Sequence, residues 1–166
     1  MKYVSCFVWM VMSLSMIMFG CSSSKGLKKE EKMAREAALR EAIENRSFVV
    51  EVDKALPMGG SSRMLTSPYS LTVKGDTVRS YLPFFGRAYS VPYGGGEGLI
   101  FNSTITDYKS SFEKNDKSLI EFKTRSKEDH LTYRVIIFMN GSASIDVISG
   151  NRQPISFNGK AYPPKE

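Results

Sequence analysis

Cysteine and histidine are scarce in this sequence of 166 residues, which contains two cysteines and one histidine. Cys6 lies in the apolar N-terminal segment and Cys21 at its end, so the rest of the chain offers no thiol for a disulfide, a zinc site or a nucleophile. His130 follows Glu128 and Asp129, but adjacent residues of a strand point to opposite faces and do not converge on a metal. The sequence therefore predicts no metal site and no cofactor, and a catalytic triad would have to use this one histidine.

Other catalytic patterns are missing as well. No serine lies in a Gly-x-Ser-x-Gly nucleophile elbow. Most acidic residues lie among lysines, as in Glu113-Lys114-Asn115-Asp116-Lys117, which is typical of a solvated surface. A carboxylate pair for glycoside hydrolysis stays open as an alternative, and the acids available for it are Glu97, Asp107, Glu113, Glu121 and Asp146. We predict that the protein is not an enzyme and has no catalytic residues.

An uncharged run opens the sequence. Residues 3–19 contain no charge and follow a single lysine, as in a secretory signal. The run ends in Met18-Phe19-Gly20-Cys21, which resembles a bacterial lipobox, in which a small residue precedes the cysteine that becomes lipidated. This resemblance implies a lipoprotein signal peptide over residues 1–20, lipidation of Cys21 and a polar tether over residues 21–26. The alternative is an uncleaved membrane helix, since about 18 apolar residues are enough to span a bilayer.

The chain is basic, with a net charge of +6 at pH 7. A basic balance can indicate nucleic-acid binding, but the predicted export argues against nucleic acid as a partner. Charge of this size also serves solubility or a modest attraction to anionic lipid or polysaccharide. We therefore expect attachment to the membrane through the lipid anchor, and an envelope small molecule, glycan or protein as a further partner.

The body of the sequence predicts one helix followed by strands. Residues 27–45 are rich in Ala, Glu, Lys and Arg, which favour a helix, and apolar residues recur at a spacing of four, as at Leu39 and Ile43. From residue 46 onward apolar residues alternate, with turns at intervals of about ten residues, as in consecutive antiparallel strands. Asn140-Gly141 is the strongest hairpin turn, since both residues tolerate positive φ. The predicted fold is mainly β: a single domain over residues 46–166, an antiparallel meander of about eight strands forming a sandwich or partly open barrel, preceded by one N-terminal α-helix.

The most unusual stretch is FFGRAYSVPYGGGEG, residues 84–98. Its glycines do not form a phosphate loop, because neither a Lys-Ser/Thr pair nor a predicted helix follows them. If residues 84–91 are extended, Phe85, Arg87 and Tyr89 share one face. Arg87 could then stack on an aromatic neighbour and pair with Glu97 across the loop.

Two interpretations of this stretch remain open. It is either a corner of the sheet fixed by an internal ion pair, or a ligand-binding site. The candidate residues under both interpretations are Phe85, Arg87, Tyr89, Tyr93 and Glu97.

Several of these pieces are similar to one protein family. Residues 82–89, LPFFGRAY, and residues 92–98, PYGGGEG, resemble the core motif of a lipoprotein family of Bacteroidetes, the domain of unknown function 4251. Shorter pieces also resemble it, namely Asn45-Arg46-x-Phe48, Asn140-Gly141-Ser142-Ala143 and Asn151-Arg152-x-x-Ile155-Ser156, so the likeness covers about residues 45–162. The resemblance implies an exported, lipid-anchored protein with one domain and brings no assigned activity, cofactor or catalytic residue. In such families acidic residues after the lipidated cysteine accompany surface exposure, and residues 22–26 contain none, which implies a periplasm-facing anchor.

The function expected from the sequence follows from these observations. An aromatic, glycine-rich segment without a catalytic set predicts a lipid-anchored protein of the bacterial cell envelope that acts as a non-enzymatic binding domain. The alternative is a structural or protein-interaction lipoprotein without a small ligand. That alternative predicts an exposed apolar patch or an open edge strand.

Overall fold

The computed structural model describes residues 24–89, 98–113, 116–127 and 129–164. The predicted signal peptide and the predicted lipidation site Cys21 lie outside these residues. The chain divides into two units whose boundary falls between Ala34 and Arg35. Among the described residues, no helix is both long enough and apolar enough to cross a membrane.

Helix α2 (Ser24–Glu44) carries the boundary between the two units. It begins earlier than predicted, so residues 24–26 of the predicted tether are helical. In its last turns Leu39, Ala42 and Ile43 are buried, and their spacing places them on one stripe of the helix. These three side chains belong to the same hydrophobic cluster as the strand residues, so the last turns of α2 are part of the core of the second unit.

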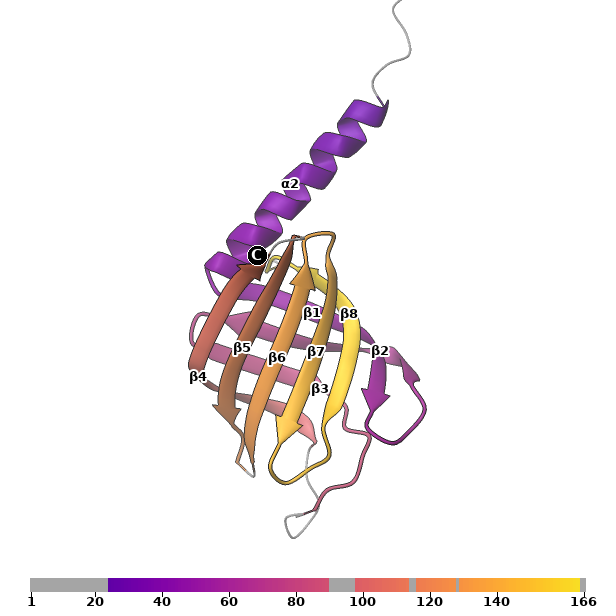
Figure 1. Ribbon diagram of the computed structural model, residues 1–166, viewed down its shortest axis with the longest axis vertical. Coiled ribbons are helices and arrows are strands. Elements are labelled where there is room, and N and C mark those ends of the chain that lie inside the picture. The colour runs from indigo at the N-terminus through magenta and orange to yellow at the C-terminus, as the bar shows by residue number, and fades with distance from the viewer. Residues whose placement is uncertain (1–23, 90–97, 114–115, 128, 165–166) are drawn as a thin grey trace, which may run out of the picture. The chain divides into compact units, whose positions relative to one another are not determined.

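Eight antiparallel strands form a closed barrel, in which each strand pairs with its neighbours in sequence and the last pairs with the first (Figure 1). The strands are β1 (Ser47–Pro57), β2 (Arg63–Lys74), β3 (Thr77–Leu82), β4 (Leu99–Glu113), β5 (Lys117–Arg125), β6 (His130–Phe138), β7 (Ser142–Ser149) and β8 (Ile155–Tyr162). Buried side chains alternate with more exposed ones along β1, β3 and β5–β8, most regularly in β3. The predicted mainly β meander with an N-terminal helix is therefore confirmed. We considered a sandwich and a partly open barrel, and the structure is a barrel that is closed.

Strand β4 reaches both halves of the barrel because it is long and bent. Residues 99–104 pair with β3, whereas residues 105–113 pair with β5. The register shifts between Thr106 and Lys109, and Asp107 lies between them with a φ of 52°. A bulge of this kind bends a strand and increases its twist, which lets one strand join two differently oriented parts of the sheet.

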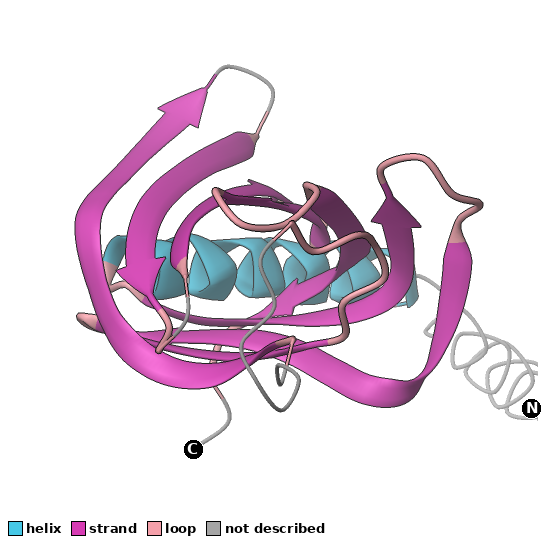
Figure 2. Ribbon diagram, turned by 90° about the horizontal axis from the view of Figure 1, so that it is seen from below, coloured by secondary structure: helices cyan, strands magenta, loops and turns pink. Residues whose placement is uncertain are grey.

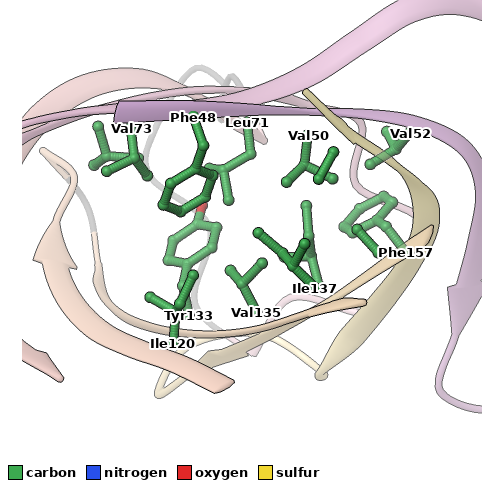
Figure 3. Close-up of a cluster of buried hydrophobic side chains, with 14 of the residues drawn as sticks. Phe48, Val50, Val52, Leu71, Val73, Ile120, Tyr133, Val135, Ile137 and Phe157 are labelled. Carbon is green, nitrogen blue, oxygen red and sulfur yellow. The ribbon is translucent and has the colours of Figure 1, made fainter. Parts of the chain in front are cut away.

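The interior of the barrel is filled with apolar side chains (Figure 3). Phe122 and Tyr133 stack there with ring centroids 5.1 Å apart. Ser80 Oγ donates to the Leu99 carbonyl oxygen at 2.7 Å, so the Tyr133 hydroxyl donates to Ser80 Oγ at 3.0 Å. Burial raises the pKa of the Tyr133 phenol well above its usual range. The interior is a packed core, and the two pockets described below lie at the ends of the barrel.

Candidate functional site: a cationic pocket at one end of the barrel

The described residues of the connections that follow β1, β3 and β7 gather at one end of the barrel, the lower end in Figure 1 and the end nearest the viewer in Figure 2. In a closed antiparallel meander all odd-numbered strands run in the same direction, so the connections that follow them lie at the same end of the barrel. They frame a pocket of ≈ 380 Å³. Its lining side chains include Met58, Ser61, Arg63, Phe85, Arg87 and Gln153. Two of the predicted site residues, Phe85 and Arg87, therefore line a pocket.

Residues 84–89 are tied to the β7–β8 connection by hydrogen bonds of the Arg87 backbone and by one β-bridge. Gln153 N donates to the Arg87 carbonyl oxygen at 3.0 Å, and Arg87 N donates to Gln153 Oε1 at 3.1 Å. Ala88 and Arg152 form an isolated β-bridge between the same two segments. The segment is thus a loop anchored at one bridge, and it differs from the extended strand that we considered from the sequence.

Phe85 is half buried and carries a guanidinium group over its ring. This group belongs to Arg63, whose Cζ lies 5.0 Å from the ring centroid. We expected Arg87 to stack on an aromatic neighbour, but on Phe85 this place is taken by Arg63. Sequence alone gave no signal for Arg63, because its position depends on how β2 pairs with β1, whose register shifts between Val52 and Lys54.

Arg152 fixes the other side of the motif. Its side chain is buried, with Cζ 5.4 Å from the centroid of the Phe84 ring. Its Nη1 donates to the Gly98 carbonyl oxygen at 2.9 Å, and Gly98 has a φ of 71°, a conformation that glycine adopts without strain. The interpretation as a structural corner therefore fits the Phe84 side of the motif. Arg152, and not Arg87, is the cation that lies beside an aromatic ring and bonds across the loop. The sequence did contain a signal for Arg152, because this residue lies in one of the short pieces that resemble the family.

The other predicted site residues lie elsewhere. The Tyr89 side chain is 70% exposed and is not among the side chains that line the pocket, while its backbone N–H donates to the Asn151 carbonyl oxygen at 2.7 Å. Tyr93 and Glu97 lie outside the described residues, so the pairing of Arg87 with Glu97 stays a prediction.

The pocket is cationic. Arg63 and Arg87 bring positive charge, Gln153 an amide and Ser61 a hydroxyl group. Within the described part of the chain, no Asp, Glu, His or Cys lines this pocket. In the same residues, no three His, Cys, Asp or Glu side chains lie together as metal ligands would. The described groups of the pocket are suited to holding an anion or a hydrogen-bond acceptor.

A second pocket, of ≈ 580 Å³, lies at the opposite end, where the even-numbered strands end. Its lining side chains include Arg35, Leu39, Met139, Ser142, Lys160 and Tyr162. The β6–β7 turn forms part of its wall, and there Gly141 has a φ of 90° and donates through its N–H to the Phe138 carbonyl oxygen at 2.8 Å. A hairpin at Asn140-Gly141 is therefore confirmed, but only Gly141 has a positive φ, so the type I′ turn that we expected from both residues is not formed.

Comparison with known families identifies this barrel. The sequence matches the model of the domain of unknown function DUF4251 over residues 30–161. The chain belongs to this family. The match covers most of α2 and the barrel almost to the end of β8, and it agrees with the resemblance seen in the sequence.

A solved structure of another DUF4251 protein supports the fold. The crystal structure of a DUF4251 family protein from Bacteroides eggerthii DSM 20697, at 1.95 Å resolution, is similar to this chain with a TM-score of 0.60. The similarity covers 80% of this chain and 91% of that chain, at 16% sequence identity. At this identity the likeness shows a shared fold. Comparison with curated proteins gave no match.

Proposed function

We propose that this DUF4251 protein is a non-enzymatic binding domain of the bacterial cell envelope, and that its small ligand occupies the pocket beside Phe85. The observation that carries the proposal is the pocket itself, ≈ 380 Å³ in volume and framed by the connections of one barrel end. Small-molecule sites in proteins are concave, measure several hundred Å³ and combine apolar walls with a few polar groups. Phe85 and Met58 supply the apolar wall here, and Arg63 and Arg87 supply the polar groups.

The arrangement of the acidic residues favours binding over hydrolysis. A glycosidase needs one carboxyl group with a raised pKa to act as general acid. Several of the acids that we considered instead contact basic or hydroxyl groups: Asp107 with Lys123, Glu113 with Lys117, Glu121 with Arg134 and Asp146 with Ser156. The hydrogen bond from Lys123 lowers the pKa of Asp107. These carboxylates are suited to cross-strand pairing on the outside of the barrel.

The anchor is the second part of the proposal. We propose that Cys21 is lipidated and holds the domain at the membrane facing the periplasm. Support comes from the uncharged run that ends in Gly20-Cys21. In Gram-negative cells fed an alkyne-tagged fatty acid, we expect label on the wild-type protein and none on Cys21→Ser. Cys6→Ser is the matched control and should keep the label. An unlabelled wild-type protein would overturn the lipid anchor.

The binding function is tested by asking whether the protein retains a small molecule from envelope extract. Protein incubated with envelope extract and washed should release a small molecule that mass spectrometry detects. Phe85→Ala should lose this molecule because the apolar wall of the pocket is removed. Tyr81→Ala changes an exposed aromatic residue outside the pocket and should retain it. Wild-type protein that retains nothing would contradict the proposed function.

One observation favours protein interaction as a second candidate function. The rings of Tyr69 and Tyr81 lie 5.3 Å apart, and Tyr81 pairs with Ile100 on the adjacent strand. Tyr81 and Ile100 are 39% and 40% exposed, so these side chains form an apolar patch on the surface of β2–β4. A photo-crosslinking residue at position 81 should then capture a protein in cells, while one at position 123 on β5 should not. Equal capture at both positions, or none, would contradict this candidate.

A further inference from the structure

The pocket beside Phe85 holds two positive charges that no described carboxylate neutralises. Arg63 enters from the start of β2, and Arg87 enters from the loop that follows β3. Some basic side chains of the barrel do pair with carboxylates, as in Arg134 with Glu121 at 3.2 Å. Among the described residues, neither Arg63 nor Arg87 has such a partner. Two like charges in one pocket repel each other, so an anion placed between them is favoured.

The Arg63 side chain and the Arg87 backbone are positioned in advance. The guanidinium group of Arg63 lies over the Phe85 ring at 5.0 Å, which leaves the edge of its planar fork available for hydrogen bonds. The backbone of Arg87 is fixed on both sides by Gln153, through the 3.0 Å and 3.1 Å hydrogen bonds. Groups that are already ordered lose less conformational entropy when a ligand binds.

The neutral polar groups of the pocket also favour an acceptor. Gln153 Oε1 accepts the Arg87 N–H, which uses one of its two lone pairs and leaves both N–H donors of its side-chain amide available. Ser61 adds a hydroxyl group that can donate. Donors therefore outnumber acceptors among the described side chains, which is the pattern of a site for oxyanions.

Apolar surface adjoins these donors. Phe85, Pro57 and Met58 line the same pocket, and the Met58 side chain is 63% exposed. The volume of ≈ 380 Å³ suits a molecule larger than a bare inorganic ion. The ligand thus needs an apolar part beside its charged group.

We infer that the pocket recognises small acids, in which a carboxylate or phosphate group lies between Arg63 and Arg87 and a flat apolar part lies against Phe85 and Met58. This inference rests on the proposed binding function and names the chemical class of the ligand. Bidentate hydrogen bonds from guanidinium groups to carboxylate or phosphate provide the selectivity.

Methionine-methyl NMR on the full chain in non-ionic detergent tests this inference, because Met58 lines this pocket and Met139 lines the opposite one. The probes are benzoate, phenyl phosphate and neutral benzyl alcohol. We expect at least one of the two acids to shift the Met58 methyl signal saturably, with benzyl alcohol at least about tenfold weaker. The Met139 signal should stay in place.

Matched variants distinguish binding that depends on the two pocket arginines from non-specific binding. Arg63→Gln and Arg87→Gln should each raise the apparent Kd of the binding acid about tenfold or more, since each removes charge-assisted hydrogen bonds. Arg79→Gln removes an exposed arginine of β3 outside the pocket and should leave the Kd unchanged. Circular dichroism checks that all three variants are folded.

The outcomes that overturn acid recognition differ from those that overturn binding. Benzyl alcohol as strong as the acids, no Met58 shift with either acid, or an unchanged Kd in both pocket variants would each overturn the inference. An uncharged molecule retained from envelope extract would overturn it as well, but would leave the binding function standing. Failure to retain any molecule overturns the binding function itself.

Discussion

Gly159 lies in β8 opposite Val52, at the point where the register of β1 shifts. A Cβ atom at this position would overlap the Glu51 carbonyl oxygen and lie 2.7 Å from Val52 Cα. We expect Gly159→Ala to lower the free energy of unfolding by about 3 kcal/mol, because backbone atoms of β1 cannot move aside without disturbing the pairing. Urea denaturation followed by circular dichroism measures the loss. Gly150→Ala meets open space and should change stability by less than about 0.5 kcal/mol; equal effects of the two substitutions would contradict this account.

Arg152 and Arg87 separate the two interpretations of the aromatic, glycine-rich motif. Arg152→Ala removes the donor to the Gly98 carbonyl oxygen and the cation over Phe84, so we expect a loss of about 2 kcal/mol. Arg87→Ala removes an exposed side chain and should cost less than about 0.5 kcal/mol. Urea denaturation of both variants gives the comparison. A loss in Arg87→Ala as large as that in Arg152→Ala would show that the corner depends on Arg87.

Tyr133 gives the stability of the barrel a dependence on alkaline pH. Burial raises the pKa of its phenol and, less strongly, that of Tyr108. In the unfolded chain tyrosine ionises near pH ~10, so below that pH both states are protonated and the stabilisation is fully present. At higher pH the unfolded phenol loses its proton first, so stability falls by up to about 1.4 kcal/mol per pH unit for each phenol. Urea denaturation between about pH 9 and 11 should show a shallower fall for Tyr133→Phe; equal slopes would contradict the assignment.

At the scale of elements, the last turns of α2 contribute to the core whereas the earlier turns are exposed. Ile43 is fully buried and Met33 is 59% exposed. We expect Ile43→Ala to lower the free energy of unfolding by about 2–4 kcal/mol, from lost burial and the cavity that remains. Met33→Ala should change it by less than about 0.5 kcal/mol. Denaturation of the two variants in parallel decides this, and a small effect of Ile43→Ala would show that α2 does not stabilise the barrel.

The strands could be predicted from sequence where one face is buried, because alternation then fixes the register of side chains. Phe48, Val50 and Val52 alternate in the sequence and are all buried. Strand β4 could not be predicted as one element, because Asp107 interrupts the pattern with a bulge that depends on the pairing with β5. The segment over residues 84–89 has strand-like residues, but a single bridge to the β7–β8 connection leaves it a loop.

At the scale of the whole molecule, closure of the barrel was beyond sequence reasoning. A sandwich and a barrel bury the same alternating residues, and they differ in whether β1 pairs with β8. That pairing joins residues such as Val50 and Ala161, and no local pattern records it. The same limit applies to the pocket: the motif drew attention to Phe85 and Arg87, but Arg63 joins them only when the barrel brings separate connections together.

Because the pocket is assembled from distant connections, a bound acid should stabilise the whole barrel. The connections after β1, β3 and β7 all contribute to it, so unfolding of the barrel destroys the site. At a ligand concentration about 100 times the Kd, we expect the free energy of unfolding to rise by about 2.7 kcal/mol, from mass action alone. Urea denaturation with and without benzoate or phenyl phosphate measures the increase. In the Arg63→Gln/Arg87→Gln double variant the increase at the same concentration should fall to about 0.4 kcal/mol or less, and a gain as large as that of the wild type would mean that the acid stabilises the barrel from another site.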